Sequence, residues 1–157
     1  MGDIYRHGDI WRPISKKSLC CLYGAWSNID EDATCPRTFV DDQGNQLNGK
    51  YNYVLHFDRE QLPHVEAFWS ITMYDKDFYL VQNDFEIYAI GDYTPGLEPN
   101  DDGSLDIYIQ YNEPINHKSN WLPAPKDEDF NLLIRMYQPS AKILNGTYEV
   151  PGVKCVR

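Results

Sequence analysis

Arginine, tyrosine and histidine side chains give this sequence its clearest capacity for chemistry. Arg135 is the best single candidate for holding a carboxylate, because its planar guanidinium donates two parallel hydrogen bonds. His56 and Tyr74 are residue types that transfer protons in active sites. Together the three are consistent with an enzyme, a hydrolase or lyase acting on a small polar compound, although no catalytic residue is identified.

The same part of the sequence also fits a surface that binds a ligand without transforming it. Aromatic rings stack on sugars and small organic molecules, and hydroxyl groups orient them. The chain has 12 Tyr and 4 Trp residues, which favours this interpretation. A solvated sheet face is a third interpretation, because Thr and Tyr are frequent in strands. The candidate ligand-binding residues are His56, Thr72, Tyr74, Tyr108, Asn120, Trp121, Arg135 and Tyr137.

Familiar catalytic and metal-binding motifs are absent from the sequence. It contains no H-x-H, no H-E-x-x-H and no G-x-S-x-G. The histidines, His7, His56, His64 and His117, are scattered, and only His56 and His64 are close enough along the chain to be weak metal candidates. We therefore expect no metal and no cofactor.

Size and charge limit the class of protein. A chain of 157 residues has the length of a single domain, 1–157. Its formal net charge of -10 argues against binding to nucleic-acid phosphates or to an anionic membrane surface. No apolar run is long enough for a membrane span or a secretion signal, so we expect a soluble, intracellular protein. A homo-oligomer stays an open alternative.

The cysteines and one Asn-Gly-Thr triplet have ordinary structural interpretations. Cys20, Cys21, Cys35 and Cys155 lack the spacing of a zinc site, so we expect reduced thiols, with a Cys35–Cys155 bridge as the alternative. Asn145 begins a glycosylation acceptor pattern, but Asn-Gly is also a tight-turn signal, and we interpret it as a turn.

Short extended segments separated by turn residues dominate the chain. Such a pattern with little helix predicts an antiparallel β-sandwich or barrel. We expect one amino-terminal helix at 15–26 and one short helix in PSAKIL near the carboxy terminus. The expected strands are 50–57, 67–75, 78–82, 85–90, 105–111, 131–137 and 147–150.

Alternation within these strands predicts the interior. Trp69, Ile71 and Met73 point to one side of their strand, and Leu105, Ile107 and Ile109 do the same in another. The other side carries the polar set His56, Ser70, Thr72, Tyr74, Tyr108, Gln110, Arg135 and Tyr137. We expect the apolar sides to meet between two sheets and the polar set to form an outer face.

The NWLPAP segment, residues 120–125, is the most informative loop. Its prolines exclude it from a central strand, and Pro123 and Pro125 fix an extended path. Trp121 is suited to cover the end of the sandwich, and Asn120 to bond to nearby backbone. A plug over the core is the favoured interpretation, and a rigid pocket wall is the alternative.

Several segments together resemble the family catalogued as domain of unknown function 1214. They are DDQGNQLNGKYNYVLHF, LPHVEAFWSITMYD, YAIGD, DGSLDIYIQ, NWLPAP and LLIRMYQP followed by ILNGTYEVP. The resemblance runs over about 17–157, which leaves 1–14 as an amino-terminal extension. Where the family pattern usually has two arginines around AIGD, this chain has Ile87 and Tyr93.

The resemblance implies a fold more than a function. In relatives the domain is usually the carboxy-terminal half of larger bacterial proteins that also carry a domain of unknown function 1254. It implies a jelly-roll-like β-sandwich, and no established reaction comes with it. We therefore expect a mainly β domain that binds a small polar molecule or glycan or has an assembly role, with the hydrolase or lyase as the alternative.

Overall fold

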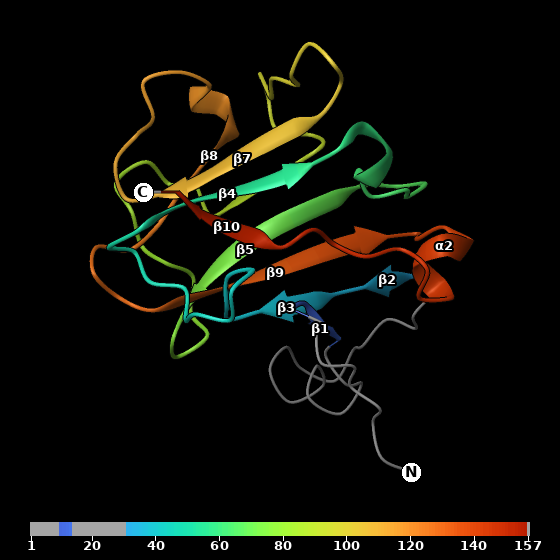
Figure 1. Ribbon diagram of the computed structural model, residues 1–157, viewed down its shortest axis with the longest axis horizontal. Helices are drawn as coiled ribbons and strands as arrows, with labels where there is room; N and C mark the ends of the chain where they lie inside the picture. Colours follow the sequence, from blue (N-terminus) through green and yellow to red (C-terminus); the bar gives the residue numbers. More distant parts are fainter. Residues whose placement is uncertain (1–9, 14–30, 157) are drawn as a thin grey trace.

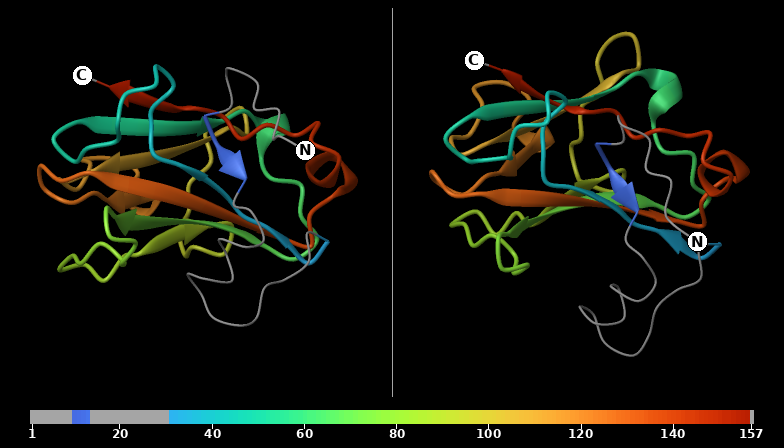
Figure 2. Two further views of the ribbon diagram at one scale, coloured as in Figure 1. Left: turned by 90° about the horizontal axis from the view of Figure 1, so that it is seen from below. Right: turned by 60° about the horizontal axis from the view of Figure 1, so that its bottom comes forward.

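The computed structural model describes residues 10–13 and 31–156. They form two stacked sheets, seen as two layers in Figure 2. The six-stranded sheet has the order β1-β3-β9-β5-β6, with β2 also paired to β9, and the four-stranded sheet has the order β10-β4-β7-β8. The mainly β sandwich expected from the sequence is confirmed. The expected helix at 15–26, Cys20, Cys21 and His7 lie outside the described residues.

Figure 1 shows where each element lies. The strands of the six-stranded sheet are β1 (Arg12–Pro13), β2 (Ala33–Thr34), β3 (Pro36–Thr38), β5 (Trp69–Asp75), β6 (Ala89–Gly91) and β9 (Phe130–Tyr137). Those of the four-stranded sheet are β4 (Asn52–Phe57), β7 (Leu105–Gln110), β8 (Trp121–Pro123) and β10 (Val153–Val156). The helical turns are η1 (Arg59–Gln61), η2 (Lys118–Asn120) and α2 (Ala141–Leu144).

The interior is the one predicted from alternation. Trp69, Ile71 and Met73 are at most 4% exposed, and Ile107 and Ile109 are fully buried. Both sheets contribute to a single cluster of buried apolar side chains. Burying a large aliphatic side chain stabilises a fold by about 1.5–3 kcal/mol, so this shared interior holds the two layers together.

Four of the expected strands are confirmed to within two residues at each end, namely 50–57, 67–75, 105–111 and 131–137. The short helix in PSAKIL is confirmed as α2, with Gly146 just past its end at a φ of 74°. Neighbouring strands are antiparallel except β7 and β8, which are parallel. β8 lies at the edge of its sheet, where its proline removes no needed donor.

The other three expected strands are wrong in whole or in part. Residues 78–82 form no strand, and of 85–90 only the last two residues belong to β6. Residues 147–150 are irregular, because the backbone amides of Thr147 and Tyr148 donate to Lys142 of α2 rather than to a neighbouring strand. The last strand, β10, begins only at Val153.

Two further outcomes concern the thiols and the helices. Cys35 and Cys155 are both free, so the alternative of a bridge between them is wrong. Burial raises the pKa of the Cys35 thiol, and the positive charge of Arg135 offsets part of that rise.

No helix within 10–13 and 31–156 is long and apolar enough to cross a membrane.

Candidate functional site

The predicted polar set divides between the two outer faces of the sandwich. Thr72, Tyr74, Arg135 and Tyr137 lie on the outer face of the six-stranded sheet, opposite the side that β5 and β9 give to the core. His56, Tyr108 and Gln110 lie on the outer face of the four-stranded sheet. The expectation of one common polar face is therefore wrong. Period-two alternation predicts which side a residue faces within its own sheet, but not which sheet its strand joins.

Arg135 is the centre of the polar group on the six-stranded sheet. Its guanidinium donates to the hydroxyl of Thr72 at 2.8 Å and to the hydroxyl oxygen of Tyr74 at 2.6 Å. β9 and β5 pair directly, with Ser70 opposite Arg135, so the sheet itself brings these side chains together. Ser70, Thr72 and Tyr74 are at most 6% exposed. This part of the face is thus buried, and it is neither a solvated surface nor an open binding surface.

A second arginine, missed from the sequence, lies beside this group. Arg37 of β3 is 3% exposed and donates to Oδ1 of Asn131 at 2.7 Å. Its guanidinium carbon lies 5.2 Å from the ring centroid of Tyr74 and 4.9 Å from that of Phe78, which is cation–π geometry. Only the pairing of β3 with β9 reveals the proximity of Arg37 to this group.

Aromatic rings complete the same face at its other end. Tyr137 stacks on Phe68 with ring centroids 4.4 Å apart, and Phe68 contacts Tyr93 edge-on at 5.6 Å. Tyr93 is one of the two positions where the resemblance noted from the sequence leads us to expect arginine. The other, Ile87, packs partly buried against the core. Tyr93, by contrast, is 61% exposed and contacts the ring of Phe68.

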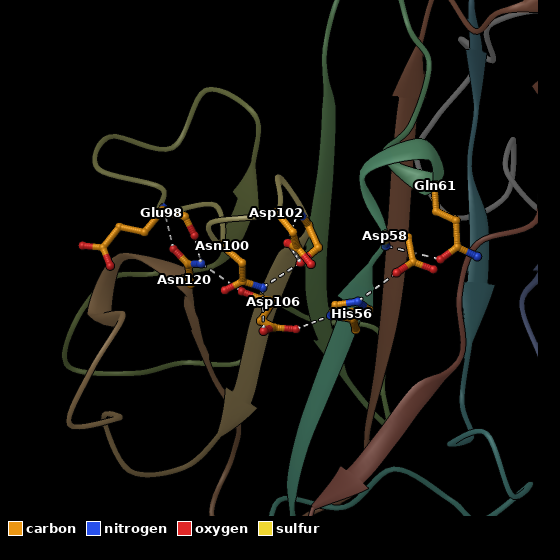
Figure 3. Close-up of polar contacts among 9 residues, drawn as sticks. His56, Asp58, Gln61, Glu98, Asn100, Asp102, Asp106 and Asn120 are labelled. Atoms are coloured by element: carbon orange, nitrogen blue, oxygen red, sulfur yellow. Dashed lines mark hydrogen bonds and ion pairs between the residues drawn. The ribbon is translucent and has the colours of Figure 1, made fainter.

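On the opposite face, His56 lies between two carboxylates (Figure 3). Its Nδ1 is 2.6 Å from Asp106 and its Nε2 is 3.2 Å from Asp58. Carboxylates only accept hydrogen bonds, so both contacts are satisfied when the imidazole is protonated. The hydrogen bond with Asp106 raises the pKa of His56, and the contact with Asp58 adds to the rise. The arrangement favours an imidazolium, which is a poor general base.

Asparagine side chains extend this network into the neighbouring loops. Asn100 donates to the second oxygen of Asp106 at 3.0 Å and to the hydroxyl of Ser104 at 2.9 Å. Asn120 is 1% exposed and donates to the backbone carbonyls of Glu98 and Asp106. Its own carbonyl accepts from the amide of Glu98. Asn120 therefore holds the loop before β7 in place, a structural role (Figure 3).

The other two histidines of the described residues have separate partners. His64 contacts the backbone carbonyl of Glu60, and His117 contacts the carboxylate of Glu98 and stacks on Tyr108. His56 and His64 thus have different partners. The part of the chain that the structure describes contains no group of three or more His, Cys, Asp or Glu placed to hold a metal.

A cavity of about 630 Å³ lies at one end of the sandwich. It is the end where β5, β7 and β8 finish, and α2 lies at the opposite end (Figure 1). Residues 80–85, 111–113 and 123–126 line the cavity together with Asp75 and Glu128. None of the eight residues predicted from the sequence is among them, because the cavity forms between segments that are far apart in the chain.

One wall of this cavity is the end of NWLPAP. Pro123, Ala124 and Pro125 line it, and Ala124 is anchored by its amide to the carbonyl of Gln110 at 3.0 Å. Trp121 is 2% exposed, and its indole N–H donates to the same carbonyl at 2.9 Å. NWLPAP therefore supplies a pocket wall, as the alternative interpretation expected. Trp121 pairs in register with Tyr108 of the outer face and lies outside the apolar cluster of the core, so the interpretation as a plug over the core is not confirmed.

The opposite wall is the loop 76–88, which is organised by two polar side chains. Oδ1 of Asp75 accepts from the amides of Asp77 and Tyr79, both at 2.9 Å. Asn83 donates to the carbonyls of Val81 and Ile87, and its oxygen accepts from the amides of Phe85 and Ile87. Although residues 76–88 form no strand, internal hydrogen bonds fix the conformation of this loop.

The comparisons with known proteins identify a family. The family model described as "Protein of unknown function (DUF1214)" matches residues 32–141. The chain belongs to this family. The resemblance stated from the sequence is thereby confirmed, and the matched region contains β2 through the start of α2, including every residue that lines the end cavity. No curated protein matches the chain.

Two solved structures share the fold. The VPA0106 protein from Vibrio parahaemolyticus superposes with a TM-score of 0.76 at 30% identity, covering 90% of this chain and 34% of that one. An uncharacterized protein from Burkholderia cenocepacia gives a TM-score of 0.62 at 14% identity, covering 94% of this chain and 34% of that one. The chain thus spans about a third of the length of each.

Proposed function

We propose that this domain binds a small polar molecule or glycan in the cavity at the end of the sandwich. The observation that carries the proposal is the cavity itself, whose volume of about 630 Å³ falls in the usual range of ligand sites, about 300–1,000 Å³. Prolines on one side and the hydrogen-bonded loop 76–88 on the other form its walls. Such rigid walls favour binding, because little conformational entropy is lost when a ligand is held.

The lining indicates the chemistry of the ligand. Phe85 and Tyr111 offer rings for stacking, and Gln82 and Asn112 offer amide donors and acceptors. The charged lining residues are Asp75, Asp84, Glu113, Glu128 and Lys126. Carboxylates accept hydrogen bonds from hydroxyl or amino groups and repel anions. A neutral sugar or an amine therefore suits the cavity better than an organic acid does.

The enzyme alternative has less support. It relied on His56, Tyr74 and Arg135 acting together, but His56 lies on one outer face of the sandwich and the other two lie on the opposite face. The described residues that line the end cavity include no His, Ser, Cys or Arg. The geometry therefore favours a binding domain.

A thermal-shift screen against neutral sugars, amines, organic acids and metal ions tests this function. A ligand that binds only the native state at about 100 times its Kd adds about 2.7 kcal/mol to the free energy of unfolding. We expect sugars or amines to raise the melting temperature and organic acids to leave it unchanged.

Two variants locate the site of any ligand found. Tyr111→Ala should weaken binding at least about tenfold, or about 1.4 kcal/mol, because it removes a stacking surface from the cavity. Tyr51→Ala is the matched control, since Tyr51 is 46% exposed against 47% for Tyr111 and lies outside this cavity. Equal affinity of the two variants for the ligand would place binding elsewhere and reject the proposal.

A further inference from the structure

The chain contains two Asn-Gly pairs in turns, Asn48–Gly49 and Asn145–Gly146. In such a pair the backbone nitrogen of glycine can attack the side-chain amide carbon of asparagine, because no Cβ shields that nitrogen. The reaction needs a side chain and a backbone that can rotate into the attacking geometry. The fold gives the two pairs opposite surroundings, so they serve as an internal comparison.

Asn145 is exposed at the end of α2, a helix of four residues. Its Oδ1 accepts from the amide of Thr147 at 3.0 Å and from the hydroxyl of Thr147 at 2.7 Å. These donors polarise the amide carbonyl and stabilise the negative charge that develops on its oxygen during attack. A Cβ built on Gly146 would meet nothing within 4 Å, so the backbone there has room to move.

The amide of Gly146 is held by a single long contact. It donates to the carbonyl of Ile143 at 3.2 Å, just past the end of a helix of four residues that is too short to be stable without its tertiary contacts. The ψ of Asn145 is 1°, so the residue must rotate before attack. The hydrogen bonds of Asn145, Gly146 and Thr147 join residues 141–147 to one another, so this turn can open without breaking a strand pairing, and the attacking geometry is accessible from the folded state.

Asn48 and Gly49 are held by contacts with residues 125–129, a segment distant in the chain. The Oδ1 of Asn48 accepts from the amide of Lys50 at 3.0 Å, a local contact like that of Asn145 with Thr147, whereas its Nδ2 donates to Asp129 at 2.7 Å and ties the side chain to a distant segment. The amide of Gly49 donates to the carbonyl of Glu128 at 2.9 Å. Gly49 is also packed so tightly that a Cβ there would lie 1.5 Å from the carbonyl oxygen of Pro125.

We propose that Asn145 is a site of spontaneous deamidation in the folded protein and that Asn48 is protected from it. The nitrogen of Gly146 loses its proton and forms a bond to the side-chain carbonyl carbon of Asn145, the bond from that carbon to the amide nitrogen breaks, and that nitrogen takes up a proton and leaves as ammonia. Water then opens the resulting succinimide at either carbonyl, which gives aspartate or isoaspartate. No oxidant, reductant or enzyme is required.

The product changes the end of α2 in two ways. A new carboxylate is placed at the carboxy-terminal end of a helix, where the helix dipole disfavours negative charge. Isoaspartate in addition lengthens the main chain by one carbon. Gly146 and Ile143 both line a cavity of about 440 Å³ at this end of the sandwich, so the modification alters the rim of that cavity.

Mass spectrometry of the aged full-length protein tests the proposal. Trypsin separates the two sites, because cleavage at Arg37 and Lys50 releases Asn48, and cleavage at Lys142 and Lys154 releases Asn145. During incubation of the folded protein at mildly alkaline pH, we expect the Asn145 peptide to convert at least about tenfold faster than the Asn48 peptide, which corresponds to about 1.4 kcal/mol in barrier height.

The same incubation in urea is the control for sequence effects. With the fold removed, the two Asn-Gly peptides should convert at similar rates, which would show that the folded environment causes the difference. Conversion of Asn48 as fast as Asn145 in the folded protein would overturn the proposal. So would an Asn145 peptide that stays intact in the folded protein while it converts in urea.

Discussion

His56 shows how strongly a single residue can depend on its neighbours. Asp58, Asp102 and Asp106 place three carboxylates around it, and the imidazole supplies positive charge among them. Burial raises the pKa of the adjacent Tyr108, and the negative charge of Asp106 adds to the rise. On the neighbouring strand, Lys154 pairs in register with Val54 and adds positive charge to the same sheet. The sequence shows the abundance of acidic residues but not which of them surround His56.

Replacement of His56 by glutamine should give a loss of stability that depends on pH. The folded pKa of His56 is raised above its ordinary value of 6.5, so its stabilising contribution is complete below pH 6.5 and is lost as the pH rises through the folded pKa. The loss should stay below about 1 kcal/mol, because the side chain is 34% exposed and solvent screens the pair.

Urea unfolding of the wild type and His56→Gln on both sides of that pKa checks this expectation. The difference in free energy of unfolding should be larger at the lower pH and should shrink at the higher pH. An NMR titration of the imidazole protons supplies the folded pKa independently. A folded pKa at or below 6.5 would contradict the assigned role of Asp106.

At the scale of elements, the loop 76–88 shows where sequence patterns mislead. Its apolar and aromatic residues predict strands, yet Phe78 and Glu86 have positive φ values, 66° and 54°, that no strand tolerates. Asp75 and Asn83 accept backbone amides that a strand would pair with a neighbour. The alternation in β5 and β7 predicts correctly because both strands lie in the middle of a sheet with one side on the core.

The end cavity is a second feature that the sequence does not predict. Its walls come from the loop 76–88, the end of β7 and the segment after β8, which meet only once the two sheets have stacked. The prolines of NWLPAP predict a rigid segment, and Pro123 and Pro125 do line one wall of the cavity. Gly49 packs closely against Pro125 of this wall, a contact that becomes visible only in the structure.

Substitution of Gly49 by alanine should therefore destabilise the protein. The added Cβ would lie 1.5 Å from the carbonyl oxygen of Pro125, so the backbone of NWLPAP must shift. Overpacking of this kind costs about 1–3 kcal/mol, and we expect the upper part of that range because the contact is with backbone. The shift should also weaken ligand binding in the cavity.

Gly44→Ala is the control, because Gly44 has a φ of 82° and open space around its Cβ. Only conformational strain of about 1 kcal/mol is expected there, with no effect on the cavity. Chemical denaturation of both variants distinguishes the two causes. If Gly49→Ala proved no more destabilising than Gly44→Ala, the close approach to Pro125 would not constrain this wall.

At the scale of the whole molecule, the two outer faces differ while the interior is shared. On the six-stranded sheet, Arg37 and Tyr74 are almost completely buried, whereas His56 on the four-stranded sheet is about one-third exposed. The proposed ligand site and the proposed deamidation site lie at the two ends of the sandwich, where loops meet, and not on either sheet face. This arrangement requires that the two sheets behave as one rigid body.

Substitutions on either side of the shared interior test that requirement. Ile71 in β5 and Ile107 in β7 are fully buried and belong to the same apolar cluster, although they lie in different sheets. Ile71→Ala and Ile107→Ala should each lower the free energy of unfolding by about 2–5 kcal/mol.

Ile115→Ala is the control, since Ile115 is 91% exposed and should change stability by less than about 0.5 kcal/mol. Because one core joins the layers, each core variant should show a single unfolding transition shifted to lower denaturant when followed by fluorescence and by circular dichroism. Two separated transitions in either variant would mean that the sheets unfold independently.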